Sequence, residues 1–420
     1  MIPTIEMRFA CIEFTTKARK IWRPTPERPN YLCDPEREID PTSFGCYTSA
    51  LNGAHIPLSG LIYGSLETPP SPLQRLRQDL TRRFTGQFRP YDLSFLADLD
   101  VLLVIYQLSN DDEIVRFIQR ARKELRNTLL VSCSSPPFGR LREHWKDHPE
   151  TITRYQTFLD STQVNMNVCR ATVPFYRQLT TTPSLYLPQP YPVEYAVEYA
   201  QKNTGHRPIL YVAGDTVRPD IVTGHLIAKT LQRRHPELLI RITKTPEFSL
   251  NTAFLRGTRF EIAPFRPWAD QVRELSGVRL VINTDLWWTR GRVPVDCAAA
   301  GVPCVGTTSD GQTELWPELA ASDSTDVDRL IALAERALTD DTFRAAAIAK
   351  ARRRLAHYAY APTVQRFTRV VELARAGRLA EWRDPAWEED TLVLPATASA
   401  AASSSSAERN SRGSRQRHET

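Results

Sequence analysis

Residues 283–306 read NTDLWWTRGRVPVDCAAAGVPCVG, and this stretch decides the fold of the second half of the chain. The apolar run that leads into it indicates a buried parallel strand that ends near Asp285. A loop with the sequence RGR at 290–292 follows, and a helix of small residues begins near Val295. A strand, a loop and a helix in this order form the repeating unit of a doubly wound sheet.

The same alternation extends outward from this stretch in both directions. Downstream of residue 205 the sequence predicts strands at 209–213, 238–243, 260–262, 279–283 and 304–306, and helices at 221–234, 268–274, 325–338, 341–356 and 363–374. Upstream it predicts strands at 8–14, 101–106, 128–132 and 163–169, and helices at 71–84, 111–125 and 151–159. We therefore predict the α/β class, with two doubly wound Rossmann-like domains that face a cleft.

Composition sets the broad class of the protein. With 420 residues, 41% hydrophobic and 24% charged, the chain is long enough for two folded domains. A net charge of +6 does not by itself indicate nucleic-acid binding. The seven scattered cysteines include no C-x-x-C pair, which argues against zinc ribbons and disulfide frameworks and favours a cytoplasmic location. We expect neither a signal peptide nor a transmembrane segment.

Ligands of open parallel sheets bind beyond the carboxyl ends of the strands. After strand 209–213, Gly214 lets a backbone approach a ligand and Arg218 offers a partner for phosphate, although an ordinary turn explains these residues equally well. No G-x-G-x-x-G fingerprint is present. After the predicted strand 260–262 we add three further candidates for the ligand site: Pro264, Phe265 and Arg266.

The loop after residue 283 is the strongest candidate for an anion site. Arg290 and Arg292 flank Gly291 beside the N-terminus of a predicted helix, where positive charge and backbone N–H groups attract anions. A structural alternative makes Asp296 a helix-terminal carboxylate on a close-packing face. Buried arginines without an anion would be costly, so we favour the anion site.

General acid–base candidates are weaker. The segment 22–69 is rich in turn-forming residues, and we expect an irregular structure there from which His55 or Asp40 could act as a base. Most histidines are not catalytic, so the structural alternative for His55 is favoured. Asp285 is a further candidate for acid–base chemistry or for positioning the ligand. The Asp98-Leu99-Asp100 sequence resembles a metal-binding Asp-x-Asp pair but precedes a strand, so we predict no metal site.

Residues 291–305 and 307–315 resemble the C-terminal domain of GT-B-fold glycosyltransferases, especially the glycogen-synthase-like retaining group. The signature of that group is a Glu, seven residues, a second Glu, a helix of small residues, Gly-Val-Pro, and a later turn with a Glu. Asp296 takes the place of the second Glu, which holds the ribose hydroxyls of the donor. The later turn near the donor is matched by three residues: Gly311, Gln312 and Glu314.

The sequence also departs from the family pattern. Trp288 stands at the position of the first Glu, and Asp215 and Asp220 stand where the family has Arg and Lys. Arg218, Arg266, Arg290 or Arg292 would have to supply the positive charge instead.

The resemblance implies a metal-independent glycosyltransferase without a cofactor, whose donor is a nucleotide-diphosphate sugar. The resemblance does not identify the acceptor, which is a glycan, a lipid, a small molecule or a modified DNA base. It implies an acceptor domain at 1–195, a donor domain at 205–360 and a helical segment, 361–383, that returns to the first domain, while composition predicts a disordered tail at 388–420. A nucleotide-sugar epimerase of the same fold and a non-catalytic binding protein remain as alternatives.

Overall fold

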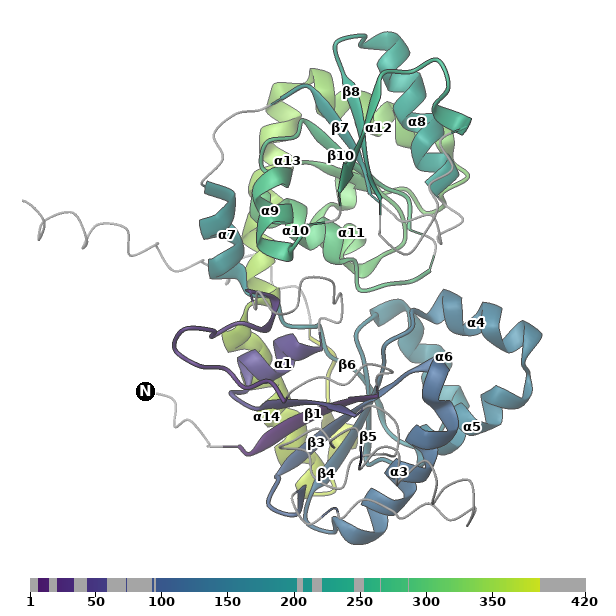
Figure 1. Cartoon of the computed structure of the whole chain (residues 1–420), viewed down its shortest axis with the longest axis vertical. Coiled ribbons are helices and arrows are strands. Elements are labelled where there is room, and N and C mark those ends of the chain that lie inside the picture. The colour runs from purple at the N-terminus through teal and green to yellow at the C-terminus, as the bar shows by residue number, and fades with distance from the viewer. Residues whose placement is uncertain are drawn as a thin grey trace, which may run out of the picture.

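The computed structural model describes residues 7–14, 21–33, 44–58, 73, 93, 96–201, 207–213, 221–244, 253–264, 266–285 and 287–385. Most of the predicted helix at 71–84 and the whole predicted tail at 388–420 lie outside these residues. Four candidate site residues also lie outside them: Asp40, Gly214, Arg218 and Phe265. The described chain forms two α/β lobes, one above the other in Figure 1, each built on its own parallel sheet.

The N-terminal sheet has the order β2-β1-β3-β4-β5-β6, and all its neighbours are parallel. Its strands are β1 (Phe9–Phe14), β2 (Ala54–Leu58), β3 (Val101–Tyr106), β4 (Leu129–Ser134), β5 (Val164–Asn167) and β6 (Ser184–Tyr186). β3 reads VLLVIY and is buried along its whole length, as expected for a central parallel strand.

Helices cover both faces of this sheet. One face packs against α3 (Asp111–Glu124) and α5 (Glu150–Asp160), and the other against α1 (Gly45–Ala50) and α14 (Tyr360–Arg375). The remaining helices of this half are α4 (Phe138–Asp147) and α6 (Val173–Leu179). The order of the strands reverses between β1 and β3, so the residues that follow these two strands border a ligand-binding crevice of this fold class.

The C-terminal sheet has the order β11-β10-β7-β8-β9 and is also parallel throughout. Its strands are β7 (Ile209–Val212), β8 (Leu239–Lys244), β9 (Phe260–Pro264), β10 (Leu280–Asn283) and β11 (Cys304–Gly306). Its helices are α7 (Val193–Gln201), α8 (Ile221–Arg234), α9 (Trp268–Leu275), α10 (Arg292–Ala300), α11 (Asp310–Leu315), α12 (Val327–Thr339) and α13 (Asp341–Leu355). Its strand order reverses between β7 and β10, which places the loop after β10 at the expected ligand crevice.

The prediction of two doubly wound domains is confirmed, and most predicted elements fall within two residues of their observed bounds. The prediction that 22–69 is irregular throughout is wrong, because α1 and β2 lie within it. β2 reads AHIPL, is buried along its length and is an edge strand. A five-residue strand with a proline and a histidine lacks both the alternation and the apolar run that identify strands from sequence.

α14 joins the two lobes. It follows α13 of the C-terminal lobe, yet its Phe367, Val370 and Val371 belong to the core of the N-terminal lobe. The ring of Phe367 meets the ring of Phe9 on β1 edge-to-face at 5.5 Å. No helix among the described residues is both long enough and apolar enough to cross a membrane.

Candidate active site

A cavity of about 320 Å³ lies between the two lobes. Its walls come from the carboxyl ends of strands in both sheets. The N-terminal lobe contributes Phe44 and residues at and after the carboxyl ends of β4 and β5, including Ser134–Phe138 and Met166–Cys169. The C-terminal lobe contributes Asn283, Asp285 and Trp288–Val293, from β10 through the start of α10. This volume is within the range of small-molecule sites.

The loop from 285 to 291 is held by its own hydrogen bonds. Asp285 accepts from the backbone N–H of Trp287 at 2.9 Å and from the hydroxyl of Thr289. Gly291 has φ +76°, in the left-handed region that favours glycine. A Cβ on Gly291 would lie 2.6 Å from Oγ of Ser309, and one on Gly311 would lie 2.5 Å from the carbonyl oxygen of Gly291. The two glycines therefore let this loop and the start of α11 touch backbone to backbone.

Arg290 is a half-buried cation that lines this cavity. Its guanidinium lies 5.8 Å from the ring centre of Phe44 in the other lobe. No carboxylate among the described residues pairs with it, and burial together with the nearby charge of Arg292 lowers its pKa to about 10. An unpaired cation in a half-buried position is costly, and an anion bound in the cavity would remove that cost.

Arg292 is the first residue of α10, and it also lines the cavity. Unlike Arg290 it has a partner, because its Nε lies 3.6 Å from a carboxylate oxygen of Asp296 one turn further along the helix. The first-turn N–H groups of a helix have no partners within the helix, and the helix dipole adds positive potential there. The three predicted residues Arg290, Gly291 and Arg292 therefore lie together on the cavity wall at the N-terminus of α10, where the potential favours anions.

Asp296 lies behind this point rather than on the cavity wall. Its Oδ1 accepts hydrogen bonds from the hydroxyl of Tyr191 at 2.7 Å and from the indole N–H of Trp268 at 2.9 Å. Burial raises the pKa of Asp296, while Arg292, Trp268 and Tyr191 act in the opposite direction. The sequence missed both aromatic partners, and the ribose role of Asp296 stays a prediction.

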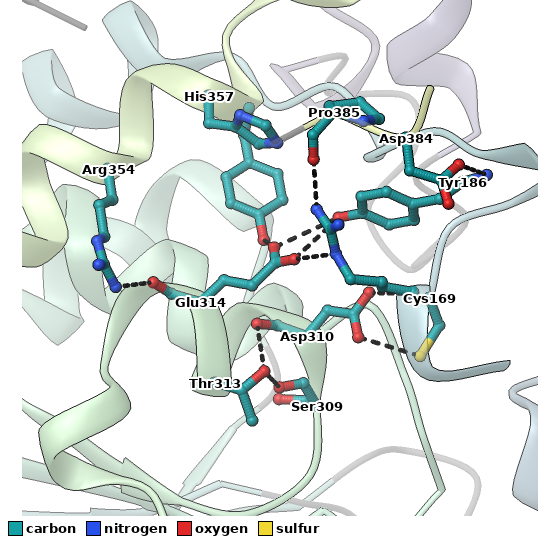
Figure 2. A network of polar contacts seen from close by, with 12 residues as sticks. Cys169, Tyr186, Ser309, Asp310, Thr313, Glu314, Arg354, His357, Asp384 and Pro385 are labelled. Atoms are coloured by element: carbon teal, nitrogen blue, oxygen red, sulfur yellow. Dashed lines mark hydrogen bonds and ion pairs between the residues drawn. The ribbon is translucent and has the colours of Figure 1, made fainter. Parts of the chain in front are cut away.

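Glu314 lies at a second contact between the lobes, shown in Figure 2. Its carboxylate accepts from the hydroxyls of Tyr358 at 2.6 Å and Tyr186 at 3.3 Å, and it pairs with Nε of Arg170 at 3.2 Å. Arg170 follows β5 and also donates to the carbonyl of Pro385. Glu314 therefore connects α11 with β6, with the segment after β5 and with Tyr358 in the turn between α13 and α14, and its predicted donor role stays a prediction.

Asp310, on the first turn of α11, belongs to the same contact. It accepts from the backbone N–H of Arg170 and from the thiol of Cys169 at 3.3 Å. Burial and the neighbouring charge of Glu314 raise the pKa of Asp310 to about 7. We name Asp310, Glu314, Arg170, Tyr186 and Tyr358 the α11 junction. Sequence analysis singled out only Glu314 of these residues.

The other described candidates lie away from the cavity wall. Gln312 is fully buried and its amide donates to the backbone carbonyls of Cys304 and Leu319. Arg266 pairs with Glu274 at 2.7 Å, and Pro264 is exposed at the end of β9. Their donor contacts stay predictions. Asp100 of the Asp-x-Asp sequence lies at the amino end of β3, as the sequence indicated. It pairs there with Arg8 and Arg375.

His55 lies in β2, where its Nε2 is 3.1 Å from a carboxylate oxygen of Glu13. Gln107, directly after β3, donates to the other oxygen of Glu13 at 2.9 Å. This buried cluster lies near the carboxyl ends of β1 and β3, where the strand order reverses, but it does not line the cavity. The role of His55 as a base stays a prediction.

The side of the cavity formed by the N-terminal lobe was missed by the sequence analysis. Residues 135–138 follow β4 directly, and Val168 and Cys169 follow β5 directly. The rule that ligands bind after parallel strands would have pointed to them, had it been applied to both lobes. Within the described ranges, no group of three or more His, Cys, Asp or Glu side chains could hold a metal ion.

Comparison with known proteins supports the fold. No protein-family profile and no curated protein sequence matches this chain. A sucrose-phosphate synthase from Thermosynechococcus elongatus superposes with a TM-score of 0.57 at 13% identity, covering 88% of this chain and 100% of that one. The α,α-trehalose 6-phosphate synthase from Burkholderia multivorans gives 0.58 at 11% identity, covering 88% and 99%. An E. coli trehalose-6-phosphate structure bound with UDP-2-fluoro glucose gives 0.52 at 12%, covering 87% and 92%. These synthases have the GT-B fold, so the predicted GT-B fold is confirmed.

Proposed function

We propose that this chain, which has the GT-B fold, transfers a sugar from a nucleotide-diphosphate sugar to an acceptor in the cavity between its lobes. The observation that carries the proposal is Arg290, a half-buried guanidinium on the cavity wall without a carboxylate partner in the described chain. A diphosphate is the anion that such a transfer leaves behind. One similar structure, that from E. coli, holds UDP-2-fluoro glucose, which is a donor of this class.

The proposed chemistry uses groups that face the cavity. The bond between the anomeric carbon and the diphosphate oxygen breaks, and its electron pair stays on the diphosphate. The acceptor oxygen forms the new bond to that carbon, and its proton passes to the released diphosphate or to solvent. Arg290, Arg292 and the first-turn N–H groups of α10 stabilise the charge that grows on the leaving oxygen. The proposed transfer therefore does not depend on a metal ion.

A second candidate is a non-catalytic protein that binds a nucleotide sugar. It is favoured by the environment of Asp296 and Glu314, the residues matched to donor-binding positions of the family. Both carboxylates already accept hydrogen bonds from aromatic side chains of the protein. A nucleoside that reached them would have to replace these donors or bind in a different position.

The test is a panel of uridine, adenosine, guanosine and thymidine diphosphate sugars. We expect at least one member to raise the melting temperature of the full chain and to lose that effect in Arg290→Ala. The matched control is Arg120→Ala, a half-buried arginine on α3 whose carboxylate partner among the described residues, Glu124, lies on the same helix. Slow release of nucleoside diphosphate from the bound sugar supports the transferase, and binding without release supports the second candidate. A shift that survives in Arg290→Ala would contradict the placement of the diphosphate.

A further inference from the structure

Charge is distributed unevenly around the interlobe cavity. The charged side chains on its wall, Asp285, Arg290 and Arg292, all belong to the C-terminal lobe. The described N-terminal residues of the wall include no Lys, Arg, His, Asp or Glu. Burial raises the pKa of Cys133 to about 12 and raises the pKa of Tyr176, so both remain neutral at ordinary pH. The described part of the wall that belongs to the N-terminal lobe, the lobe predicted to bind the acceptor, is therefore uncharged.

Two aromatic rings, one from each lobe, meet at the edge of this uncharged side. Phe138 and Trp288 are both half-buried wall residues, and their rings meet edge-to-face at 6.1 Å. Phe138 comes from the N-terminal lobe and Trp288 from the loop of the C-terminal lobe. We name this pair the aromatic corner. Such a surface packs well against a flat apolar ring.

The aromatic corner is fixed in place by backbone contacts. The N–H of Gly139 donates to the carbonyl of Trp287 at 3.1 Å, and a Cβ on Gly139 would lie 2.9 Å from Cα of Trp287. Trp288 itself has φ +49°, an unfavourable conformation for a non-glycine residue. The loop therefore holds the Trp288 ring against α4 in a strained backbone conformation, as residues at binding sites often do.

One cation lies close to this corner. The guanidinium of Arg142 is 5.7 Å from the Trp288 ring centre and 5.9 Å from the Phe138 ring centre. Arg142 is exposed and does not line the cavity. Its charge lies beside the aromatic corner, but Arg142 is not itself a residue of the described wall.

We infer that the acceptor is an uncharged, planar ring compound with a hydroxyl group, which packs against Phe138 and Trp288. This rests on the transfer proposed above. A phosphorylated acceptor would need either a cation on its own side of the cavity or a share of Arg290 and Arg292 with the diphosphate. Ser135 and Asn167 are uncharged wall residues that can hydrogen-bond a neutral ring substituent. The ring could be a free aromatic alcohol or a hydroxylated base in DNA.

The experiment measures binding by calorimetry with the full chain and without any donor. The probes are 2-naphthol, glucose 6-phosphate, and 5-hydroxymethylcytosine both as a nucleoside and within a DNA duplex. We expect 2-naphthol or the nucleoside to bind saturably and Trp288→Ala to weaken that binding on the order of tenfold, with Trp288→Phe in between. Binding of the base only within the duplex identifies DNA as the source of the ring. Leu226→Ala, an exposed apolar position on α8, is the control.

Two results would overturn the inference. One is saturable binding of glucose 6-phosphate that is lost in Arg290→Ala or Arg142→Ala while no ring compound binds. The other is the absence of binding by every ring probe. Melting temperatures of Trp288→Ala and Trp288→Phe separate lost binding from lost folding. The binding assay contains no donor, so its result is independent of the donor-release assay described above. Ring binding here together with no release of nucleoside diphosphate in that assay refutes the transferase proposal and leaves the ring site standing.

Discussion

The two contacts between the lobes differ in how their charges are satisfied. At the α11 junction, the carboxylates of Asp310 and Glu314 each accept hydrogen bonds from protein donors of the other lobe. At the start of α10, Arg290 faces the cavity without a carboxylate partner among the described residues. The difference is why we propose the ligand site from the absence of a protein partner at Arg290 rather than from the family-matched positions.

The largest effect on stability should come from Glu314→Ala. This variant leaves Tyr358, Tyr186 and Arg170 without their shared acceptor, and breaking a buried charged contact costs about 3 kcal/mol or more. Arg170 is partly exposed, which places the effect at the lower end of that range. Denaturant unfolding of the full chain measures it. Glu335→Ala, which removes partly exposed pairs with Arg234 and His235, should cost less than about 1 kcal/mol. Equal effects would refute the structural role of the α11 junction.

Arg290→Ala should have the opposite profile. We expect turnover of the donor to fall on the order of a hundredfold, which corresponds to about 2.7 kcal/mol, with little change in melting temperature. Arg292→Ala should retain more activity, because part of its charge is already balanced by Asp296. Arg290→Lys should rescue only partly, since an ammonium group cannot replace the planar guanidinium. Steady-state kinetics of wild type and the three variants measure these losses of turnover. A larger loss in Arg292→Ala than in Arg290→Ala would contradict the assignment of the main diphosphate contact to Arg290.

Asp296 shares a feature with each contact: it has protein hydrogen-bond partners, as Glu314 does, and it lies next to the proposed diphosphate site, as Arg290 does. The variant Asp296→Asn tests which feature matters more. Asn keeps one acceptor for Tyr191 and Trp268 but loses the charge, so we expect a loss of stability of about 1 to 2 kcal/mol. Donor affinity, measured by calorimetry on the same variant, provides the second reading. An affinity loss on the order of tenfold or more with unchanged stability would favour the ribose role over the structural one.

The smallest effect concerns pH. The pKa of Asp310 is raised to about 7 in the folded chain, so the folded state binds this proton more tightly than the unfolded state does. The stability that this proton contributes is present below the ordinary pKa of Asp and is lost as pH rises towards 7. The melting temperature of wild type relative to Asp310→Asn should therefore fall from about pH 4 to about pH 7 and level off above it. Asp323→Asn is the control, because the pKa of that exposed carboxyl is lowered. A parallel course for wild type and Asp310→Asn would contradict the shift.

Sequence reasoning was strongest where the signal is local. VLLVIY at 101–106 was predicted as a strand with its observed bounds, and the loop 290–292 was placed correctly at the end of a parallel strand. It could not foresee that Asp296 meets Tyr191, 105 residues away, or that Glu314 meets Tyr186, 128 residues away. Such pairs depend on the tertiary packing within and between the lobes, which neither periodicity nor a short motif encodes. A short motif can therefore point to a residue without showing which distant side chains surround it.

The return of α14 to the first lobe affects the order in which the chain can fold during synthesis. The core around β1 includes Phe367, Val370 and Val371, so it is incomplete until nearly all of the described chain has left the ribosome. The core of the second lobe ends at Tyr358 and is complete sooner. Domains are usually finished in their order along the chain. Here the lobe that is translated first is the one that must wait for its last helix.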